Sequence, residues 1–196
     1  MKIFKCLSLS FVILTAIIAF PVYGDVTLHA LFSDHMVLQC DLEVPVWGRA
    51  EPGEKVTVEF AGQSISAVAD AKGFWMARLK PLAASSESRE MTVSGKNKVI
   101  IKDVLVGEVW LASGQSNMFW PVLKCLNGQK EVADASHPSL RLFQVPSAAA
   151  GEPRTEVAGR WAVGSPESVG DFSAVAYYFG RHLHKELKVP VGLVHA

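Results

Sequence analysis

The sequence has few cysteines and no excess of charge of either sign. It contains 3 Cys, and 19 Lys and Arg residues balance 19 Asp and Glu residues, so its formal net charge is zero. This balance, without any Lys/Arg run, gives no electrostatic reason to expect nucleic acid or an anionic membrane as partner. The sequence also lacks a C-x-x-C pair and a His/Cys cluster at metal-ligand spacing. It therefore predicts no metal site.

The first 24 residues are typical of a secretory signal peptide. Lys2 and Lys5 precede an apolar stretch over residues 7–20, and Val22-Tyr23-Gly24 has the pattern of a cleavage site. A membrane anchor is the disfavoured alternative, because a spanning helix needs about 20 apolar residues. We therefore expect export to the periplasm or the extracellular space, with no membrane attachment after cleavage.

Cleavage after Gly24 would leave two cysteines, Cys40 and Cys125. Export would permit a disulfide between them. They lie far apart in the sequence, however, and the sequence does not show whether they meet in space. Both alternatives, a disulfide and two free thiols, stay open at this point.

Residues 25–106 have the pattern of an all-β domain. Polar and apolar residues alternate in short segments, and turn sequences such as Glu51-Pro52-Gly53-Glu54 separate them. Strands are predicted at 44–48, 55–60, 64–69, 74–79, 89–94 and 98–102. Short strands with frequent turns predict a β-sandwich.

From residue 107 onward the pattern changes to that of an α/β domain. Residues 108–112, 140–145 and 189–195 read as strands, and residues 171–188 as an amphipathic helix that begins at Asp171. This alternation predicts the start of a parallel sheet. Because parallel sheets need several strands, we expect residues 107–196 to be a truncated part of an α/β domain. The strand over 189–195 would then lack a neighbour on at least one side. The alternative is a small complete domain with an unusual C-terminus.

A serine lies in the polar segment that follows the predicted strand over 108–112. Side chains just after a strand lie at the carboxyl edge of an α/β sheet, where binding sites form. Ser116 would be a nucleophile there if a base and backbone N–H groups stood nearby. An ordinary turn explains the same residues, and the residues alone favour the turn.

The block from Gly107 to Met118, GEVWLASGQSNM, closely resembles the nucleophile block of the sialate O-acetylesterase family. These are serine esterases of the SGNH, or GDSL-like, hydrolase superfamily. Further blocks resemble the family at 31–39, 45–48, 51–56, 172–180 and 189–193. The resemblance implies that Ser116 is the nucleophile and that its backbone N–H is an oxyanion donor. It makes Gln115 and Asn117 candidates for shaping the turn and contacting substrate.

The other catalytic groups of the family cannot be placed on this chain. The family has a glycine oxyanion donor just after the strand that ends here at His195, an asparagine donor further on, and a histidine base in a late D-x-x-H block. Asp134-Ala135-Ser136-His137 spells D-x-x-H, but it precedes the predicted helix and the last strand. Ordinary loop chemistry explains it, so the resemblance implies an N-terminal fragment that is itself inactive.

Several other side chains have open roles. His195 ends a strand at the functional edge, where it is a candidate for lining the pocket. His182 and His184 are interpreted as structural residues of the helix. Trp120 is either a core residue, the favoured interpretation, or a platform for stacking a sugar. The remaining tryptophans in strand patterns are predicted to be core, namely Trp47, Trp75 and Trp110.

The resemblance implies a secreted carbohydrate O-acetylesterase, most specifically a sialate O-acetylesterase. Its serine would attack the acetyl ester of an O-acetylated sugar, and water would then release acetate from the acyl-enzyme. No metal or organic cofactor is implied. One alternative is a related esterase that acts on acetylated xylan. The other belongs to a different class, a carbohydrate-binding β-sandwich protein without catalysis.

Overall fold

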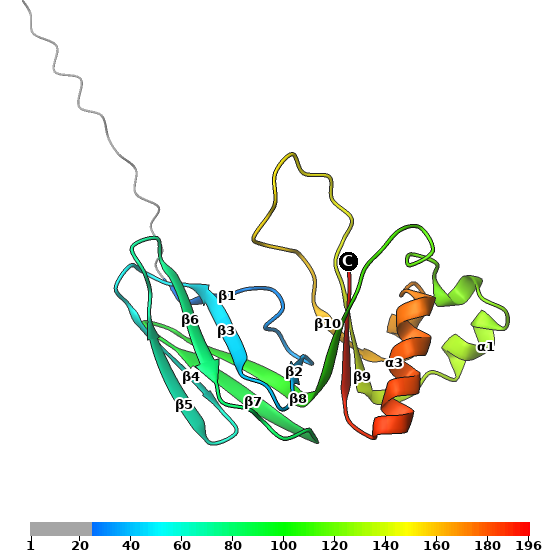
Figure 1. The fold of residues 1–196 in the computed structure, drawn as a ribbon, viewed down its shortest axis with the longest axis horizontal. Coiled ribbons are helices and arrows are strands. Elements are labelled where there is room, and N and C mark those ends of the chain that lie inside the picture. Colours follow the sequence, from blue (N-terminus) through cyan, green and yellow to red (C-terminus); the bar gives the residue numbers. More distant parts are fainter. Residues whose placement is uncertain (1–24) are drawn as a thin grey trace, which may run out of the picture.

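The structure is a computed structural model that describes residues 25–196, in two halves joined by one long strand (Figure 1). The predicted signal peptide, residues 1–24, lies outside the described residues. None of the helices in residues 25–196 has the length and apolar character needed to cross a membrane.

The first half consists of strands alone. They are β1 (Thr27–Leu28), β2 (Val37–Gln39), β3 (Val44–Arg49), β4 (Lys55–Phe60), β5 (Gln63–Val68), β6 (Phe74–Leu79), β7 (Ser85–Ser94) and β8 (Lys98–Ala112). The second half contains the 3-10 helix η1 (Val122–Lys124), α1 (Gly128–Ala133), β9 (His137–Gln144), β10 (Trp161–Gly164), α2 (Pro166–Val169), α3 (Ala174–Leu187) and β11 (Val191–His195).

Two sheets enclose the core of the first half. Strands β1, β3 and β6 form a three-stranded sheet, while β4, β5, β7 and β8 belong to a mixed sheet of eight strands. The alternation in residues 55–60 places Val56, Val58 and Phe60 on the buried side of β4. Trp75 of β6 joins the same core. Five of the six strands predicted in this half are present with ends that differ by at most four residues, and the sixth, over 98–102, is the start of a longer strand.

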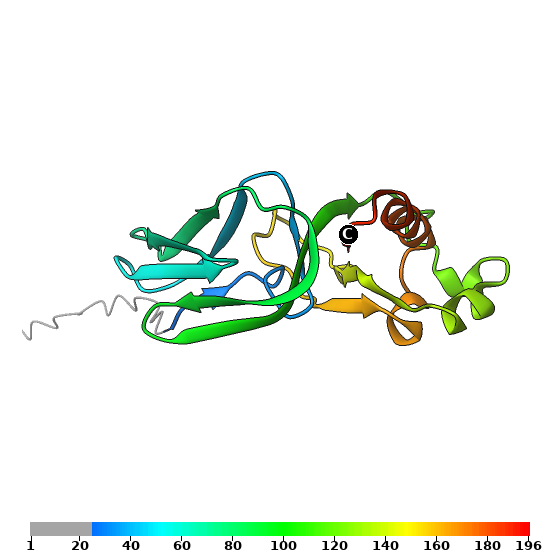
Figure 2. The same cartoon turned by 90° about the horizontal axis from the view of Figure 1, so that it is seen from below.

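Strand β8 runs from the first half into the second. Separate strands were expected over 98–102 and 108–112, but one strand covers residues 98–112. It pairs with β7 and β2 up to Gly107 and then runs parallel to β11 over residues 108–112. A Cβ atom on Gly107 would lie 2.0 Å from the carbonyl oxygen of Pro190, so only glycine permits this approach. Figure 2 shows β8 arching between the halves.

Strand β11 lies between two parallel neighbours, β8 and β9. Leu193 is opposite Trp110 on one side and Leu142 on the other. The expectation that this strand would lack a neighbour is therefore wrong, because β9 comes in on its far side. Helix α3 packs against β11 and begins after its N-cap Ser173, whose hydroxyl accepts from the N–H of Ala176 at 3.2 Å. Asp171 is thus not the N-cap.

A buried ion pair joins the two halves. The guanidinium of Arg141 on β9 is almost fully buried, and its Nη1 lies 2.6 Å from Oδ2 of Asp103 on β8. Nδ1 of His35 lies 2.6 Å from the same oxygen. Burial alone would raise the pKa of Asp103, but the hydrogen bonds from Arg141 and His35 outweigh it and hold this pKa well below its usual range.

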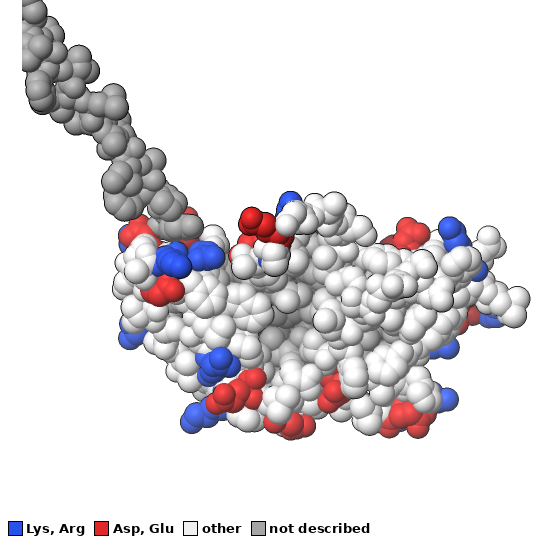
Figure 3. Space-filling model, turned by 45° about the horizontal axis from the view of Figure 1, so that its top comes forward, with Lys and Arg blue, Asp and Glu red and all other residues white. Residues whose placement is uncertain are grey.

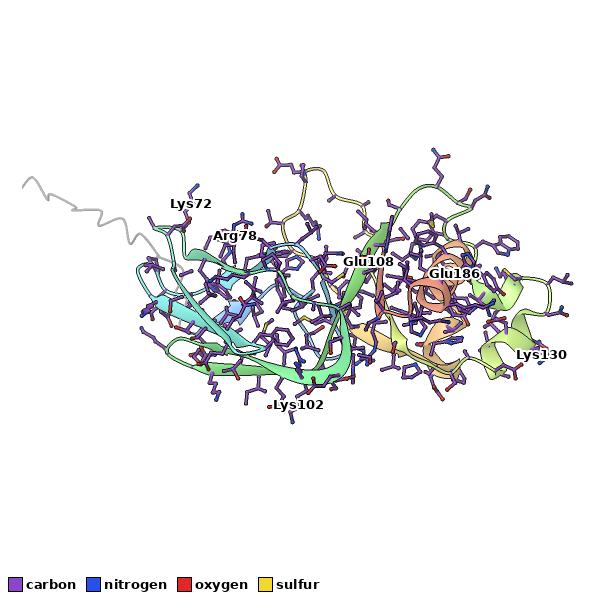
Figure 4. All side chains as sticks on the ribbon, turned by 60° about the horizontal axis from the view of Figure 1, so that its bottom comes forward. Lys72, Arg78, Lys102, Glu108, Lys130 and Glu186 are labelled. Atoms are coloured by element: carbon purple, nitrogen blue, oxygen red, sulfur yellow. The ribbon has the colours of Figure 1, made fainter. Side chains whose placement is uncertain are left out.

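Glu108 marks the junction of the halves on β8 (Figure 4). Its carboxylate accepts hydrogen bonds from the amide of Gln39 and the thiol of Cys40, each at 3.5 Å. Burial and the neighbouring carboxylates raise the pKa of Cys40 to about 11. Cys40 and Cys125 are both free thiols. Of the two alternatives left open by the sequence, the structure therefore has the free thiols and not the disulfide.

Candidate active site

The carboxyl ends of three parallel strands meet at one edge of the mixed sheet. His195, the last residue of β11, is opposite Ala112 of β8 and Gln144 of β9. The segment that carries Ser116 leaves the sheet directly after Ala112. The face turned forward in Figure 3 has charged side chains of both signs around its rim and few across its middle.

Residues 115–120 form a series of tight turns. The N–H of Met118 donates to the carbonyl of Gln115 at 2.8 Å, and the N–H of Phe119 donates to that of Ser116 at 3.1 Å. Trp120 repeats the pattern with Asn117 at 3.3 Å. The side chain of Ser116 is exposed. Within residues 25–196 the backbone N–H of Ser116 is bonded to no carbonyl, so it is available to an oxyanion.

The N-terminus of α3 holds this series of turns in place. The hydroxyl of Ser173 lies 3.4 Å from Sδ of Met118. The N–H of Ala174 donates to the carbonyl of Trp120 at 2.8 Å, and the N–H of Val122 donates to that of Phe172 at 3.1 Å. The segment that carries Ser116 is therefore anchored on both sides, by β8 before it and by the start of α3 after it.

His195 is the buried histidine at this edge, with 2% of its surface exposed. Its ring packs between Phe119, at 4.7 Å between centroids, and Phe172, at 5.6 Å. Nδ1 lies 2.8 Å from Oε1 of Gln144. The amide nitrogen of Gln144 donates to the carbonyl of Val145 at 3.3 Å, which leaves Oε1 as an acceptor and assigns the imidazole proton to Nδ1.

The other ring nitrogen, Nε2, is buried and has no hydrogen-bond partner among the described residues. Burial lowers the pKa of His195. The ring is therefore neutral near pH 7, with a lone pair on Nε2. Since it packs against Phe119, three residues after Ser116, its clearest role is to support the nucleophile segment. The predicted place of His195 at the functional edge agrees with the structure.

Asn117 and Gln115, the two candidates beside the nucleophile, differ in their surroundings. Both side chains are exposed. Asn117 lines a shallow pocket of about 380 Å³, and Gln115 does not. The other residues that line this pocket are Trp120, Cys125, Ala174, Val175 and Tyr178. Their roles as substrate contacts stay predictions.

His137, the D-x-x-H histidine, lies at the opposite edge of the sheet. It is the first residue of β9, an eight-residue strand, so it is about 25 Å from the edge where Ser116 lies. Its Nε2 lies 3.1 Å from the hydroxyl of Tyr177, and burial lowers its pKa. This place excludes it as the base for Ser116. His184 is also committed elsewhere, since its Nδ1 lies 2.7 Å from the carbonyl of Val189.

The tryptophans divide into buried and exposed side chains. Trp75 is fully buried and Trp47 packs partly buried against the first core, as predicted. Trp110 is 43% exposed, so the core prediction for it is wrong, although its ring packs edge-on against Phe179 at 5.1 Å. Trp120 is 51% exposed, so the favoured core interpretation for it is wrong too. The described residues contain no group of three His, Cys, Asp or Glu side chains able to hold a metal ion.

Sequence reasoning missed the partners of His195. Gln144 fixes its tautomer, and Phe119 and Phe172 enclose its ring. The signal for Gln144 was present, because it lies in the predicted strand over 140–145 and parallel strands end at the same edge. Phe119 had no such signal, since it lies in the irregular segment before η1. Phe172 lay within the helix predicted over 171–188, but it precedes α3, and nothing in the sequence indicated its contact with the imidazole.

Comparisons with known proteins show what the chain as a whole is similar to. No family model matches the chain. Mouse sialate O-acetylesterase is 34% identical over 181 residues, which are 82% of this chain and 34% of that protein. The human enzyme is 31% identical over 182 residues, 83% of this chain and 35% of that protein. The crystal structure of a carbohydrate acetylesterase from Xanthomonas citri superimposes with a TM-score of 0.84 at 38% identity, over 87% of this chain and 40% of that one.

The fold, with its mixed sheets, is thus that of a carbohydrate acetylesterase. More particularly, the chain is related to the sialate O-acetylesterase family, and the predicted resemblance is confirmed. The chain spans about a third of the length of the curated relatives that it matches.

Proposed function

We propose that this chain carries the nucleophile of an exported carbohydrate O-acetylesterase of the sialate type. Residues 25–106 would form its β-sandwich domain, and residues 107–196 the N-terminal part of an SGNH-type catalytic domain. One observation carries the proposal. Ser116 is exposed on an anchored turn at the edge where β8, β9 and β11 end, in a chain similar to such esterases.

The geometry suits acyl transfer. Oγ of Ser116 attacks the acetyl carbonyl carbon while a base takes the hydroxyl proton. The backbone N–H of Ser116 donates to the oxygen that becomes negatively charged. The sugar hydroxyl leaves with the proton, and the acetyl group stays on Ser116. Water then attacks this ester and releases acetate, which restores the serine.

The resemblance implies a histidine base in a late D-x-x-H block, and His137, His184 and His195 are not placed to take that role. His137 lies at the wrong edge of the sheet and His184 is bonded to Val189. Nε2 of His195 is enclosed by phenylalanine rings and has no hydrogen bond to Ser116. We therefore expect residues 25–196 alone to show essentially no turnover, since a serine without a base is a weak nucleophile.

Acetate release from O-acetylated sugars by the full-length gene product tests the proposal. We expect release from O-acetylated sialic acid. Faster release from acetylated xylan would favour the alternative esterase, one that acts on xylan. The similarity to a bacterial carbohydrate acetylesterase is compatible with this alternative. If the folded product bound these sugars and released no acetate from either, the non-catalytic binding protein would replace the esterase.

A further inference from the structure

A shallow pocket opens directly beside the nucleophile. Its volume is about 380 Å³, and its lining is mostly apolar. Two aromatic residues, Trp120 and Tyr178, line it together with Asn117, whose side chain carries an amide. Ser116 is not among the lining residues, but it directly precedes Asn117 in the chain, so the pocket lies close to the segment that carries the proposed nucleophile.

Trp120 is held firmly although its ring is half exposed. Its N–H donates to the carbonyl of Asn117 at 3.3 Å, and its carbonyl accepts from the N–H of Ala174 at 2.8 Å. The next residue, Pro121, forms an isolated β-bridge with Ser173. The backbone is thus fixed from both sides while 51% of the residue faces solvent.

Packing within the protein explains the other exposed tryptophan but not this one. Trp110 is 43% exposed, and its ring has an aromatic partner in Phe179 at 5.1 Å. Among residues 25–196 the ring of Trp120 has no aromatic partner, and the ammonium of Lys124 lies over it at 6.0 Å from its centroid. Lys124 is an exposed, flexible side chain, which can move aside. An exposed aromatic face on a rigid segment is typical of a binding surface.

We propose that Trp120 is the platform on which the sugar ring of the ester substrate stacks. This proposal rests on the proposed function and names the subsite that positions the sugar for attack by Ser116. One face of a pyranose ring presents C–H groups, which suit the indole, while its hydroxyls point outward to water and to the amide of Asn117. An aromatic wall with few polar groups is the composition expected for such a subsite.

Turnover of two esters by the full-length gene product tests the platform. The first ester is O-acetylated sialic acid, and the second is ethyl acetate, which has no ring to stack. Loss of one aromatic contact is expected to lower the ratio of kcat/KM for the sugar ester to kcat/KM for ethyl acetate about tenfold in Trp120→Ala. Trp120→Phe keeps an aromatic face and should restore most of the ratio. Leu126→Ala, at a strongly exposed nearby residue outside the pocket, is the matched control and should leave the ratio as in the wild type.

An equal loss of kcat/KM on both esters in Trp120→Ala, or no loss on either, would overturn the platform.

A direct binding measurement separates that failure from a failure of the proposed function. N-acetylneuraminic acid, the deacetylated sugar, is added to the full chain while the indole N–H resonances are followed by NMR, with Trp120→Phe identifying the signal of Trp120. A shift of this signal without any ester turnover would retain the platform and reject the esterase. Esterase turnover without a shift, and with an unchanged ratio in Trp120→Ala, would retain the esterase and reject the platform.

Discussion

At the scale of single residues, Ser116 and His195 have opposite surroundings, although both belong to the same edge of the sheet. Ser116 stands in solvent on an anchored turn, whereas His195 is enclosed by Phe119, Phe172 and Gln144. The hydroxyl is therefore accessible to a substrate, and the imidazole is held neutral. The difference fits the proposal that Ser116 is the reacting group, with His195 packed against the segment that carries it.

The neutral state of His195 predicts a pH dependence of stability. Because burial lowers its pKa in the folded protein, the unfolded chain binds the proton more readily, and stability falls as pH drops below about 6.5. His137, whose pKa burial also lowers, contributes to the same fall. We expect the free energy of unfolding, measured in urea at pH 7 and pH 5, to fall less for His195→Gln than for the wild type. The exposed variant His182→Gln should keep the wild-type fall, and an equal fall in all three proteins would contradict the burial argument.

The residue types around Ser116 did not by themselves predict a nucleophile; the prediction came from the family resemblance. A serine in a polar turn is ambiguous, and the structure adds its exposure and its free N–H. The exposure of Trp110 and Trp120 could not be predicted, because a tryptophan in an apolar pattern reads as core whichever side of the strand or turn it occupies. Local sequence does not show which face of an element another element covers.

At the scale of elements, the sheet edge depends on contacts between distant segments. Strand β8 is one continuous strand because β2, β7 and β11 pair along it in turn. The alternation within each strand was readable from the sequence, and β7 and β8 pair as neighbours along the chain. The pairings of β8 with β2 and β11 join distant segments, such as Val37 with Leu105 and Val191 with Glu108, and no local pattern encodes them. For the same reason the position of β11 between β8 and β9 was predicted wrongly.

The ion pair between β8 and β9 predicts a large effect of one substitution. Asp103→Asn keeps the shape of the side chain, and Asn tolerates the positive φ of 55° at this position. It removes the charge that compensates the buried Arg141, so we expect a loss of about 2–4 kcal/mol in the free energy of unfolding at pH 7. Urea unfolding measures this loss. Glu87→Gln, which breaks an exposed pair with Arg89, should change stability little.

The same pair has its own dependence on pH. The pKa of Asp103 is depressed in the folded protein, so its stabilising contribution is fully present above the unfolded pKa of about 3.9 and is lost as pH falls below it. The difference in stability between the wild type and Asp103→Asn should therefore shrink in acid. A difference that stayed constant from pH 7 to pH 3 would show that the charge on Asp103 is not its cause.

The packing of α3 on β11 predicts that Gly180 cannot be enlarged freely. A Cβ atom there would lie 2.6 Å from Cδ1 of the buried Leu193. We expect Gly180→Ala to lower the free energy of unfolding by about 1–3 kcal/mol, because an overpacked core must shift. Gly151→Ala is the matched control, since a Cβ atom at Gly151 meets nothing within 4 Å. Thermal unfolding of both variants measures the effect, and equal midpoints would contradict the close packing.

At the scale of the whole molecule, the chain combines a fold similar to that of a carbohydrate acetylesterase with a predicted export signal. Its relatives are similar over most of its length, although it spans only about a third of theirs. Export predicts that N-terminal sequencing of the secreted protein begins at Asp25. A secreted protein that begins at Met1 would show that residues 1–24 are not removed.

The central claim is that Ser116 is the nucleophile of an O-acetylesterase, and the rate of acetate release by Ser116→Ala tests it most directly. Full-length wild type and variant are compared on O-acetylated sialic acid, with circular dichroism to confirm that both are folded. Removal of the attacking oxygen leaves the exposed turn intact, so we predict the wild-type fold and a fall in kcat of at least about 10³-fold. Acetate release at close to the wild-type rate by the folded variant would contradict the account.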